Sequence, residues 1–399
     1  MNRTTQTGRR TAVKRKRAIV AAAIERRCAI VAAVVGRKRA IVAAAIAVAL
    51  SAAGVLAACS TADEIVLATY NVENLFDAVY DGTEYASFDP RGERWGPNRY
   101  ARSLENTVGV IGELGGGDGA DILALQEIEN DRVLADLAGE LSRMGYRYKL
   151  LVANDGPFHN AIFSRLPVTA ARTHALGLPW AAPGRYILEV DLEWAGRSIR
   201  LLVNHWHSKV RGDRETEPSR REAAGIVARR VRVSAGEGIP TIVAGDLNLS
   251  ADEYRRRAGE YPTALLPVDS IDRYDPRRSL FLTTRPGEAT LSGEAVVLYS
   301  PWKARLYDES SGLGSPPGTY VYQGRWKSLD HIMFGPGFAD AAATTGGESP
   351  DGRGSIGIGE FRVVAEPYML DSRGAPRRWR SDIAHGYSDH LPVEVTLRR

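Results

Sequence analysis

Acidic, amide and histidine side chains recur at the ends of apolar runs in this sequence, and together they could act on a charged ester. Asp246 and Asn248 follow the run Ile239–Ala244, and their i, i+2 spacing in an extended chain places both on one face. Asp389 and His390 adjoin each other and could present a carboxylate and an imidazole to the same phosphate. Hard divalent cations prefer oxygen ligands, so one or two carboxylates suffice to hold one.

Other candidates are less specific when each is taken alone. Glu127 follows the run Leu123–Gln126, and Asn71 follows a strand-like stretch. A lone asparagine lies most often in a turn, and a lone glutamate most often in a solvated loop. Asp246 and Asn248 could equally form a turn after a strand. The functional interpretation depends on many such residues meeting at one edge of a sheet.

Alternating strand-like and helix-like stretches must position these residues, and they predict an α/β protein with a mixed sheet. No linker is evident, so residues 60–399 are expected to form one domain. Gly- and Pro-rich Ser310–Gly318 and Thr345–Gly359 predict long surface loops. The expected helices are Tyr100–Leu114, Val133–Leu141 and Arg220–Val233. The expected strands are Ile65–Tyr70, Ile122–Leu125, Tyr148–Val152, Asn160–Ser164, Tyr186–Trp194, Ile199–Asn204, Ile239–Ala244, Leu329–Phe334, Phe361–Ala365 and Val393–Leu397.

Six short motifs occur in a fixed order, and together they resemble a known superfamily. They are TYNVENLFD (Thr69–Asp77), LALQEIEND (Leu123–Asp131), VNHWHSK (Val203–Lys209), VAGDLN (Val243–Asn248), SLDHIMF (Ser328–Phe334) and GYSDHLPVEV (Gly386–Val395). The set resembles the endonuclease/exonuclease/phosphatase superfamily of metal-dependent phosphoesterases, in a bacterial branch of exported, nuclease-like proteins. The resemblance covers roughly Ile65 to Leu397. It implies a four-layer α-β-β-α sandwich of two mixed sheets flanked by helices.

The resemblance also implies roles for individual residues. Asp246 would activate or orient the attacking water, and Asp330 would orient His390, because a carboxylate behind a histidine fixes its tautomer. The expected metal ligands are Asn71, Glu127 and Asp389, for Mg²⁺ or Mn²⁺, with Ca²⁺ also compatible. The expected catalytic residues are His205, Asp246, Asn248, Asp330 and His390. The expected substrate-binding residues are Asn160, Lys209 and Arg211.

Composition leaves the substrate open. The chain has 399 residues and a formal net charge of +4, but residues 1–58 hold 12 Lys/Arg and one acid, so the remainder is net −7. Charge therefore gives no general argument for binding nucleic acid. Basic residues nevertheless cluster over Lys209–Arg232, which includes Arg220, and Arg377, Arg378 and Arg380 precede Asp389. Lys209, Arg211 and Arg214 follow His205 closely and could reach a polyanion, which favours a nuclease acting on DNA or RNA. The alternatives are a sphingomyelinase-like or inositol-phosphate phosphoesterase and a non-catalytic surface-binding lipoprotein.

Residues 1–59 have the pattern of an export signal. A basic segment precedes the uncharged residues 40–59, and Leu56–Cys59 resembles a bacterial lipobox whose cysteine is lipidated. An uncleaved membrane anchor and a cleaved soluble protein are the alternatives. The expectation is an exported protein. It would be a lipoprotein held at the cell envelope membrane through lipidated Cys59, or it would be secreted. No protein partner is evident, and a monomer is expected.

Overall fold

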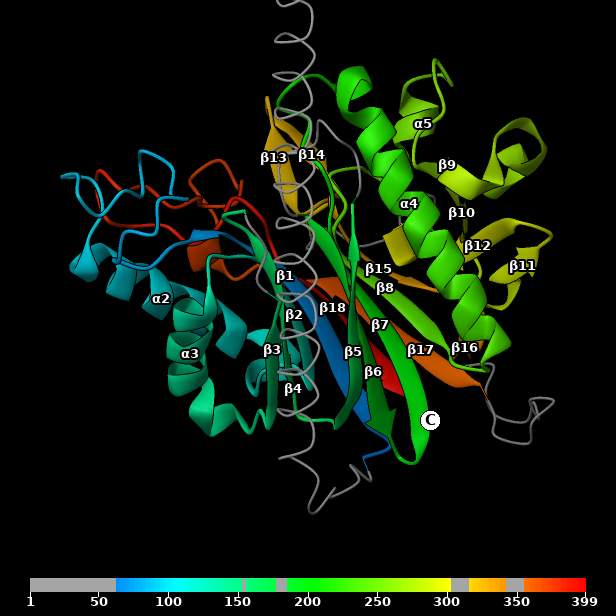
Figure 1. Cartoon of the computed structure of the whole chain (residues 1–399), viewed down its shortest axis with the longest axis horizontal. Coiled ribbons are helices and arrows are strands. Elements are labelled where there is room, and N and C mark those ends of the chain that lie inside the picture. Colours follow the sequence, from blue (N-terminus) through cyan, green and yellow to red (C-terminus); the bar gives the residue numbers. More distant parts are fainter. Residues whose placement is uncertain (1–61, 153–155, 177–184, 303–315, 342–354) are drawn as a thin grey trace, which may run out of the picture. The chain divides into compact units, whose positions relative to one another are not determined.

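The structure is a computed structural model that describes residues 62–152, 156–176, 185–302, 316–341 and 355–399 (Figure 1). All of these belong to one unit of the chain, Ala58–Arg399. The expected leader and Cys59 lie outside the described residues. Among the described residues, no helix combines the length and the apolar character needed to cross a membrane.

The described residues form two large mixed sheets. The first has seven strands in the order β16-β17-β18-β1-β2-β4-β3. Its centre is β1, which runs parallel to β2 and antiparallel to β18. The bounds are β1 Glu64–Leu75, β2 Ile122–Ile128, β3 Tyr148–Leu151, β4 His159–Ser164, β16 Phe338–Asp340, β17 Ile356–Val363 and β18 Val393–Arg398.

The second sheet has nine strands among the described residues. Eight follow the order β5-β6-β7-β8-β15-β12-β10-β9, and β11 pairs with β12. Their bounds are β5 Val168–Ala175, β6 Tyr186–Trp194, β7 Arg197–His205, β8 Thr241–Asp246, β9 Leu265–Pro267, β10 Leu280–Thr283, β11 Thr290–Ser292, β12 Ala295–Tyr299 and β15 Asp330–Phe334. A separate hairpin joins β13 Tyr320–Tyr322 to β14 Arg325–Lys327.

Helices cover the outer faces of the two packed sheets (Figure 1). Helices α2 (Pro97–Gly112) and α3 (Asp131–Glu140) lie on the first sheet, and α4 (Asp213–Gly236) lies on the second. Contacts of β1 with β8 and β15 join the sheets face to face. The expected four-layer α-β-β-α sandwich is therefore confirmed. A short helix, α5 (Glu253–Arg256), and 3-10 turns at Leu114–Gly117, Leu141–Met144, Val268–Arg273, Pro276–Arg278, Pro286–Glu288 and Pro367–Met369 complete the described elements.

Local chemistry explains where two helices begin. Pro97 occupies the first turn of α2, where its missing N–H costs no hydrogen bond. The Asn130 side chain caps α3 by accepting hydrogen bonds from the backbone N–H groups of Arg132 and Val133. Both helices bury apolar stripes, which include Leu104, Val110 and Ile111 in α2. These helices fix the outer side of the sheet that carries Asn71 and Glu127.

Two expectations about secondary structure need correction. The loop expected over Thr345–Gly359 is wrong at its end, because β17 already begins at Ile356; residues 342–354 lie outside the described part, as does most of the loop expected over Ser310–Gly318. Glycine is unfavourable in strands, so the Gly-rich stretch resembled a loop, yet Gly357 pairs in register with Arg398. The helix expected at Arg220–Val233 is longer and begins at Asp213.

Candidate active site

Strand register places three of the candidate residues in one row across the second sheet. Asp246 at the end of β8 is opposite His205 on parallel β7 and opposite Asp330 on antiparallel β15. Residues directly opposite each other in paired strands point to the same face. The preceding Gly245, at φ 125°, permits this row because a Cβ there would collide with the Asn204 carbonyl. The row therefore depends on residues from three separate parts of the chain.

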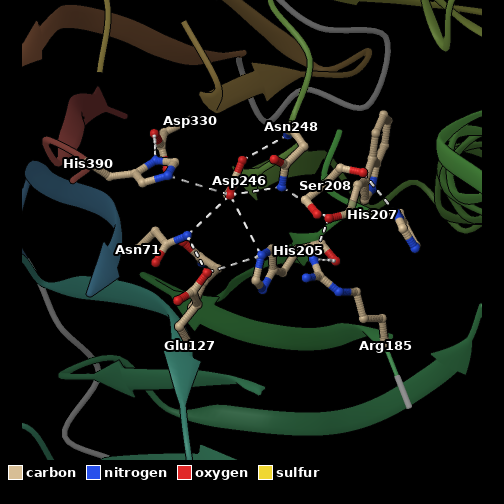
Figure 2. Close-up of polar contacts among 12 residues, drawn as sticks. Asn71, Glu127, Arg185, His205, His207, Ser208, Asp246, Asn248, Asp330 and His390 are labelled. Atoms are coloured by element: carbon tan, nitrogen blue, oxygen red, sulfur yellow. Dashed lines mark hydrogen bonds and ion pairs between the residues drawn. The ribbon is translucent and has the colours of Figure 1, made fainter. Parts of the chain in front are cut away.

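The first sheet supplies Asn71 from β1 and Glu127 from β2, and both reach the row (Figure 2). The Asn71 Nδ2 group donates to Glu127 Oε1 at 3.2 Å and to Asp246 Oδ2 at 3.1 Å. Glu127 has φ 67°, in the left-handed region that non-glycine residues rarely occupy. Its Oε2 accepts the backbone N–H of Asn74 at 2.8 Å. Unfavourable backbone geometry of this kind is typical of functional sites.

Asp389 and His390 approach the same point from the loop before β18. The Ser388 hydroxyl donates to the Asn71 carbonyl at 2.7 Å and accepts the His390 N–H at 3.0 Å, so the loop is tied to β1. His390 Nδ1 lies 2.7 Å from Asp330 Oδ2. Its Nε2 lies 3.9 Å from Asp246 Oδ2 and 3.9 Å from Asp389 Oδ1. Asp330 thus occupies the position of an orienting carboxylate, and Nε2 faces the centre of the site.

His205 faces the same centre. Its Nε2 lies 3.6 Å from Glu127 Oε1 and 3.6 Å from Asp246 Oδ2. Burial, reinforced by the nearby Arg185 cation, lowers the pKa of His205 well below its usual value. His205 is therefore neutral near pH 7.

Burial lowers the pKa of His205 but raises the pKa of the acidic groups around it. It raises the pKa of Glu127, and the Asp389 carboxylate raises it further. Burial also raises the pKa of Asp246 to about 7, with His390 opposing and Asp330 adding to the increase. Although burial alone would lower the pKa of His390, the carboxylates of Asp330 and Asp246 raise it well above its usual value. Several perturbed groups in one place are typical of an active site.

The donor set suits a divalent cation. Buried carboxylates require a partner of opposite charge or a metal ion. Among the described residues, no lysine or arginine forms an ion pair with Glu127 or Asp246. One ligand atom from each of Asp246, Asp330 and His390 also lies within 4.8 Å of the others. Since Asp330 is already engaged by His390 Nδ1, the oxygens of Glu127, Asp246 and Asp389 are the better match to a hard cation.

Asn248 belongs to the same cluster. It has φ 50°, and its Nδ2 donates to Asp246 Oδ2 at 3.0 Å and to the Trp206 carbonyl at 3.1 Å. Its backbone N–H donates to Asp246 Oδ1 at 2.8 Å. The structure thus brings together eight of the predicted residues. They are Asn71, Glu127, His205, Asp246, Asn248, Asp330, Asp389 and His390.

The three predicted substrate-binding residues lie outside this cluster. Asn160 Nδ2 donates to the carbonyls of Tyr186 and Val203, at 2.8 Å and 3.2 Å, which occupies both of its hydrogens. Lys209 forms an ion pair with Glu253, while Arg211 is exposed. Their proposed contacts with substrate stay predictions, and the geometry favours Arg211 over the other two.

Two charged residues near the site were not assigned to it from the sequence. The Arg185 guanidinium donates to the carbonyls of His205, at 3.4 Å, and of Trp206. Arg378 pairs with buried Glu73 at 2.6 Å and lies 3.7 Å from Asp389 Oδ2. The one sequence signal for Arg185 is a cation directly before an apolar strand, which is a common pattern. Arg378 stood out only as part of a basic stretch before Asp389.

Comparisons with known proteins find one family match and several structures of similar fold. Residues 66–255 match the Endonuclease/Exonuclease/phosphatase family. No curated protein sequence matches the chain significantly. Among solved structures, truncated TDP2 from Caenorhabditis elegans is 17% identical, with 84% of this chain and 98% of that chain covered and a TM-score of 0.48. A mannosyl-6-phosphatase from Bacteroides thetaiotaomicron is 17% identical, with 84% and 100% covered and a TM-score of 0.48. An endonuclease/exonuclease/phosphatase from Bacteroides vulgatus is 15% identical, with 84% and 98% covered and a TM-score of 0.49.

Proposed function

We propose that this chain, whose residues 66–255 match the Endonuclease/Exonuclease/phosphatase family, is a divalent-metal-dependent phosphodiesterase that cleaves nucleic acid outside the cytoplasm. The family is one of phosphoesterases. The observation that carries the proposal is the row of His205, Asp246 and Asp330, completed by Glu127 and His390. These side chains are of the types that metal-assisted phosphoester hydrolysis uses, and this supports the proposal.

Each residue has a chemical role that follows from its surroundings. Asp246, with a pKa of about 7, is suited to orient an attacking water and accept its proton near neutral pH. His390, protonated because of its raised pKa, directs Nε2 into the site, where it could donate to a phosphate oxygen as negative charge builds up. Neutral His205 offers an uncharged second contact on the opposite side of Asp246.

Glu127 and Asp389 would hold a cation, with Asn71 supporting Glu127. Such an ion, when bound, supplies charge neutralisation to the phosphate and polarises a water. We propose Mg²⁺ or Mn²⁺, with Ca²⁺ as a further possibility, because the donors are oxygen atoms. Asn71 donates to both Glu127 and Asp246, and these hydrogen bonds hold the two carboxylates close together.

Nucleic acid is the proposed substrate because exposed cations border the site. Arg211 is exposed on the loop that follows β7, and the Arg378 side chain is 63% exposed beside Asp389. Either could contact a phosphate next to the one being cleaved. Other members of the cluster first noted around Lys209 serve the fold, because Arg220 is fully buried and pairs with Glu217 at 2.7 Å.

A substrate panel tests the proposal. The purified protein is assayed with DNA, RNA, sphingomyelin, inositol phosphates and phosphomonoesters, each with Mg²⁺, Mn²⁺ or Ca²⁺. Cleavage of DNA or RNA is the expected result. Hydrolysis of a lipid or phosphomonoester alone would overturn the choice of substrate and leave the metal site standing. Absence of any hydrolysis would favour a non-catalytic binding protein.

Export and anchoring are proposed from the sequence of residues 40–59 alone. If Cys59 is lipidated, a Cys59→Ala variant should be released from the membrane fraction of the expressing cells. A variant that stays embedded would favour an uncleaved helical anchor. Monomeric state is proposed because no partner surface is evident in the sequence, and light scattering on the purified chain tests it.

A further inference from the structure

The segment between β1 and α2 carries exposed aromatic rings close to the active site. Tyr85 is 47% exposed and Tyr80 is 46% exposed. Beneath them lies a buried aromatic cluster of Phe76, Phe88 and Trp95, which also includes Trp379 from the loop before β18. Rings in this cluster pack 4.9–6.0 Å apart, so the segment has a firm base.

Tyr85 is connected to the active site through one intervening ring. Its centroid lies 5.5 Å from that of Phe158, and the Phe158 centroid lies 6.1 Å from that of His205. Burial raises the pKa of Tyr85, the Glu127 carboxylate raises it further, and the Arg185 cation lowers it. Tyr85 therefore borders the site on the side of His205.

A small hollow adjoins His205 on this side. Phe158, Asn160, Arg185 and His205 are among the residues that line it. Asn160 is 8% exposed, and its Oδ1 has no hydrogen-bond partner among the described residues. Both hydrogens of Asn160 Nδ2 are taken, and the unpartnered Oδ1 is itself buried in the wall. The hollow is too small for a nucleobase, so a flat ring could lie only outside it, on the exposed face of Tyr85.

We propose that Tyr85, with Phe158 behind it, forms a stacking surface for the nucleobase next to the phosphate at His205. This inference rests on the proposed nuclease function and adds the single-stranded form of the substrate. Stacking between a base and an aromatic side chain tolerates every base, because each has a flat π-face. A base held in a duplex would not be available to Tyr85.

The charges of the segment oppose a lipid surface as the partner. Asp81 and Glu84 lie between Tyr80 and Tyr85 and are themselves exposed or half-buried. Burying these carboxylates in an acyl layer would be costly. The same charges repel a phosphate backbone, so contact through an uncharged base is the favoured mode.

Tyr80 provides a matched control. It lies on the same segment with nearly the same exposure, but the Arg91 guanidinium lies 3.4 Å from its ring centroid. One face of Tyr80 is therefore covered. A Tyr80→Ala change should leave substrate affinity within about twofold of the wild-type value, whereas loss of an open stacking ring costs about tenfold.

The experiment measures KM and kcat for a labelled single-stranded oligonucleotide and for the same strand with abasic sites around the cleaved bond. Tyr85→Ala should raise KM about tenfold on the base-containing strand, Tyr85→Trp should restore it, and the abasic strand should remove the difference. This loss should not depend on salt, because stacking neutralises no phosphate.

Three results would overturn the inference. If the wild type cleaves the oligonucleotide and Tyr85→Ala has the same KM, the stacking surface is contradicted but the proposed function is not. A Tyr85→Ala effect on binding to phosphatidylcholine–sphingomyelin vesicles, with oligonucleotide cleavage unchanged, assigns the ring to a lipid. A wild-type protein that cleaves no oligonucleotide contradicts the proposed function as well, so the two failures are distinguishable.

Discussion

Two buried carboxylates of the second sheet, Asp246 on β8 and Glu189 on β6, have opposite surroundings. Glu189 accepts from Arg230 Nε at 2.6 Å, from Arg172 Nη1 at 2.9 Å and from His174 Nε2 at 2.8 Å. Asp246 is surrounded by Asn71, Asn248 and two histidines (Figure 2). Among the described residues it has no lysine or arginine partner.

The pKa values reflect this difference. Burial alone would raise the pKa of Glu189, but its hydrogen bonds and ion pairs lower it to about 2. Burial raises the pKa of Asp246 to about 7. A buried acid matched by arginines of its own chain stabilises the fold, whereas an unmatched acid is arranged for a cation or proton from outside. The buried carboxylate on β6 therefore stabilises the fold, whereas the one on β8 is available for chemistry.

The largest expected effect is on turnover. Asp246→Asn and His390→Ala should each lower kcat by roughly 10²–10⁴-fold, because general acid–base and electrostatic contributions have that size. Thermal stability should fall little or even rise in Asp246→Asn, since a buried carboxylate is removed. His390→Ala should be less stable, because it leaves buried Asp330 without its partner. Steady-state kinetics and calorimetry on the same preparations check both parts. Near-normal rates for both variants would show that the site has been assigned wrongly.

Glu189→Gln should give the reverse pattern. Removing one partner of a buried ionic network leaves its arginines uncompensated, so unfolding should become easier by about 3–5 kcal/mol. Activity at 25 °C should persist, because Glu189 faces α4 through Arg230 and not the active site. Exposed Glu105, which pairs with Arg102 on the surface of α2, provides the control, and Glu105→Gln should change stability by less than about 1 kcal/mol.

The stability of the protein at acid pH tests the role of Glu189 in a second way. The folded-state pKa of Glu189 lies below its usual value of 4.5, so its contribution is complete above pH 4.5 and is lost as pH falls towards 2. Denaturant unfolding at pH 6, 4 and 3 should show the wild type losing stability over this interval. The Glu189→Gln variant should lose less over the same range. Parallel curves for the two proteins would contradict the role given to the network.

Asp330→Asn should have a smaller effect on catalysis than Asp246→Asn. Asp330 contacts His390 Nδ1 and positions it, so its loss should reduce kcat by about tenfold. The pH–rate profile provides the discriminating readout, because the variant should also lower the pKa assigned to His390. A profile identical to that of the wild type would mean that the pair does not act together.

The smallest expected effect is on the salt dependence of nuclease activity. Arg211→Ala should reduce the slope of log(kcat/KM) against log[salt] by about one, as for the loss of one phosphate contact. Arg102→Ala, on exposed α2, should leave the slope unchanged. Equal slopes for all three proteins would remove Arg211 from the substrate path.

The sequence could predict much of the site because its residues follow the ends of strong apolar runs. Asp246 comes just after such a run, so its place at a strand end could be predicted. The extended spacing expected for Asn248 is wrong, because β8 ends at Asp246 and Asn248 reaches its carboxylate through a turn at φ 50°. The row of His205, Asp246 and Asp330 could not be predicted from local pattern, because β8 and β15 are far apart in the chain. Register between distant strands is set by tertiary packing.

Short elements and loop residues were missed for a different reason. Strands such as β9 and β11 have three residues each, too few to show periodicity. Tyr85 and Arg185 lie outside the regular strands and helices, and their roles depend on what the fold brings beside them. The basic stretch after His205 was divided by burial, which places Arg220 inside and leaves Arg211 exposed.

The central claim is that the unmatched carboxylates around Asp246 exist to hold a divalent cation. Calorimetric titration of Mn²⁺ into chelator-treated protein tests it most directly, with the wild type, Glu127→Gln and Glu189→Gln measured side by side. The account predicts saturable binding by the wild type and by Glu189→Gln, loss of binding by Glu127→Gln, and hydrolysis that requires the added metal. Full hydrolysis in excess chelator, or unchanged Mn²⁺ binding by Glu127→Gln, would contradict it.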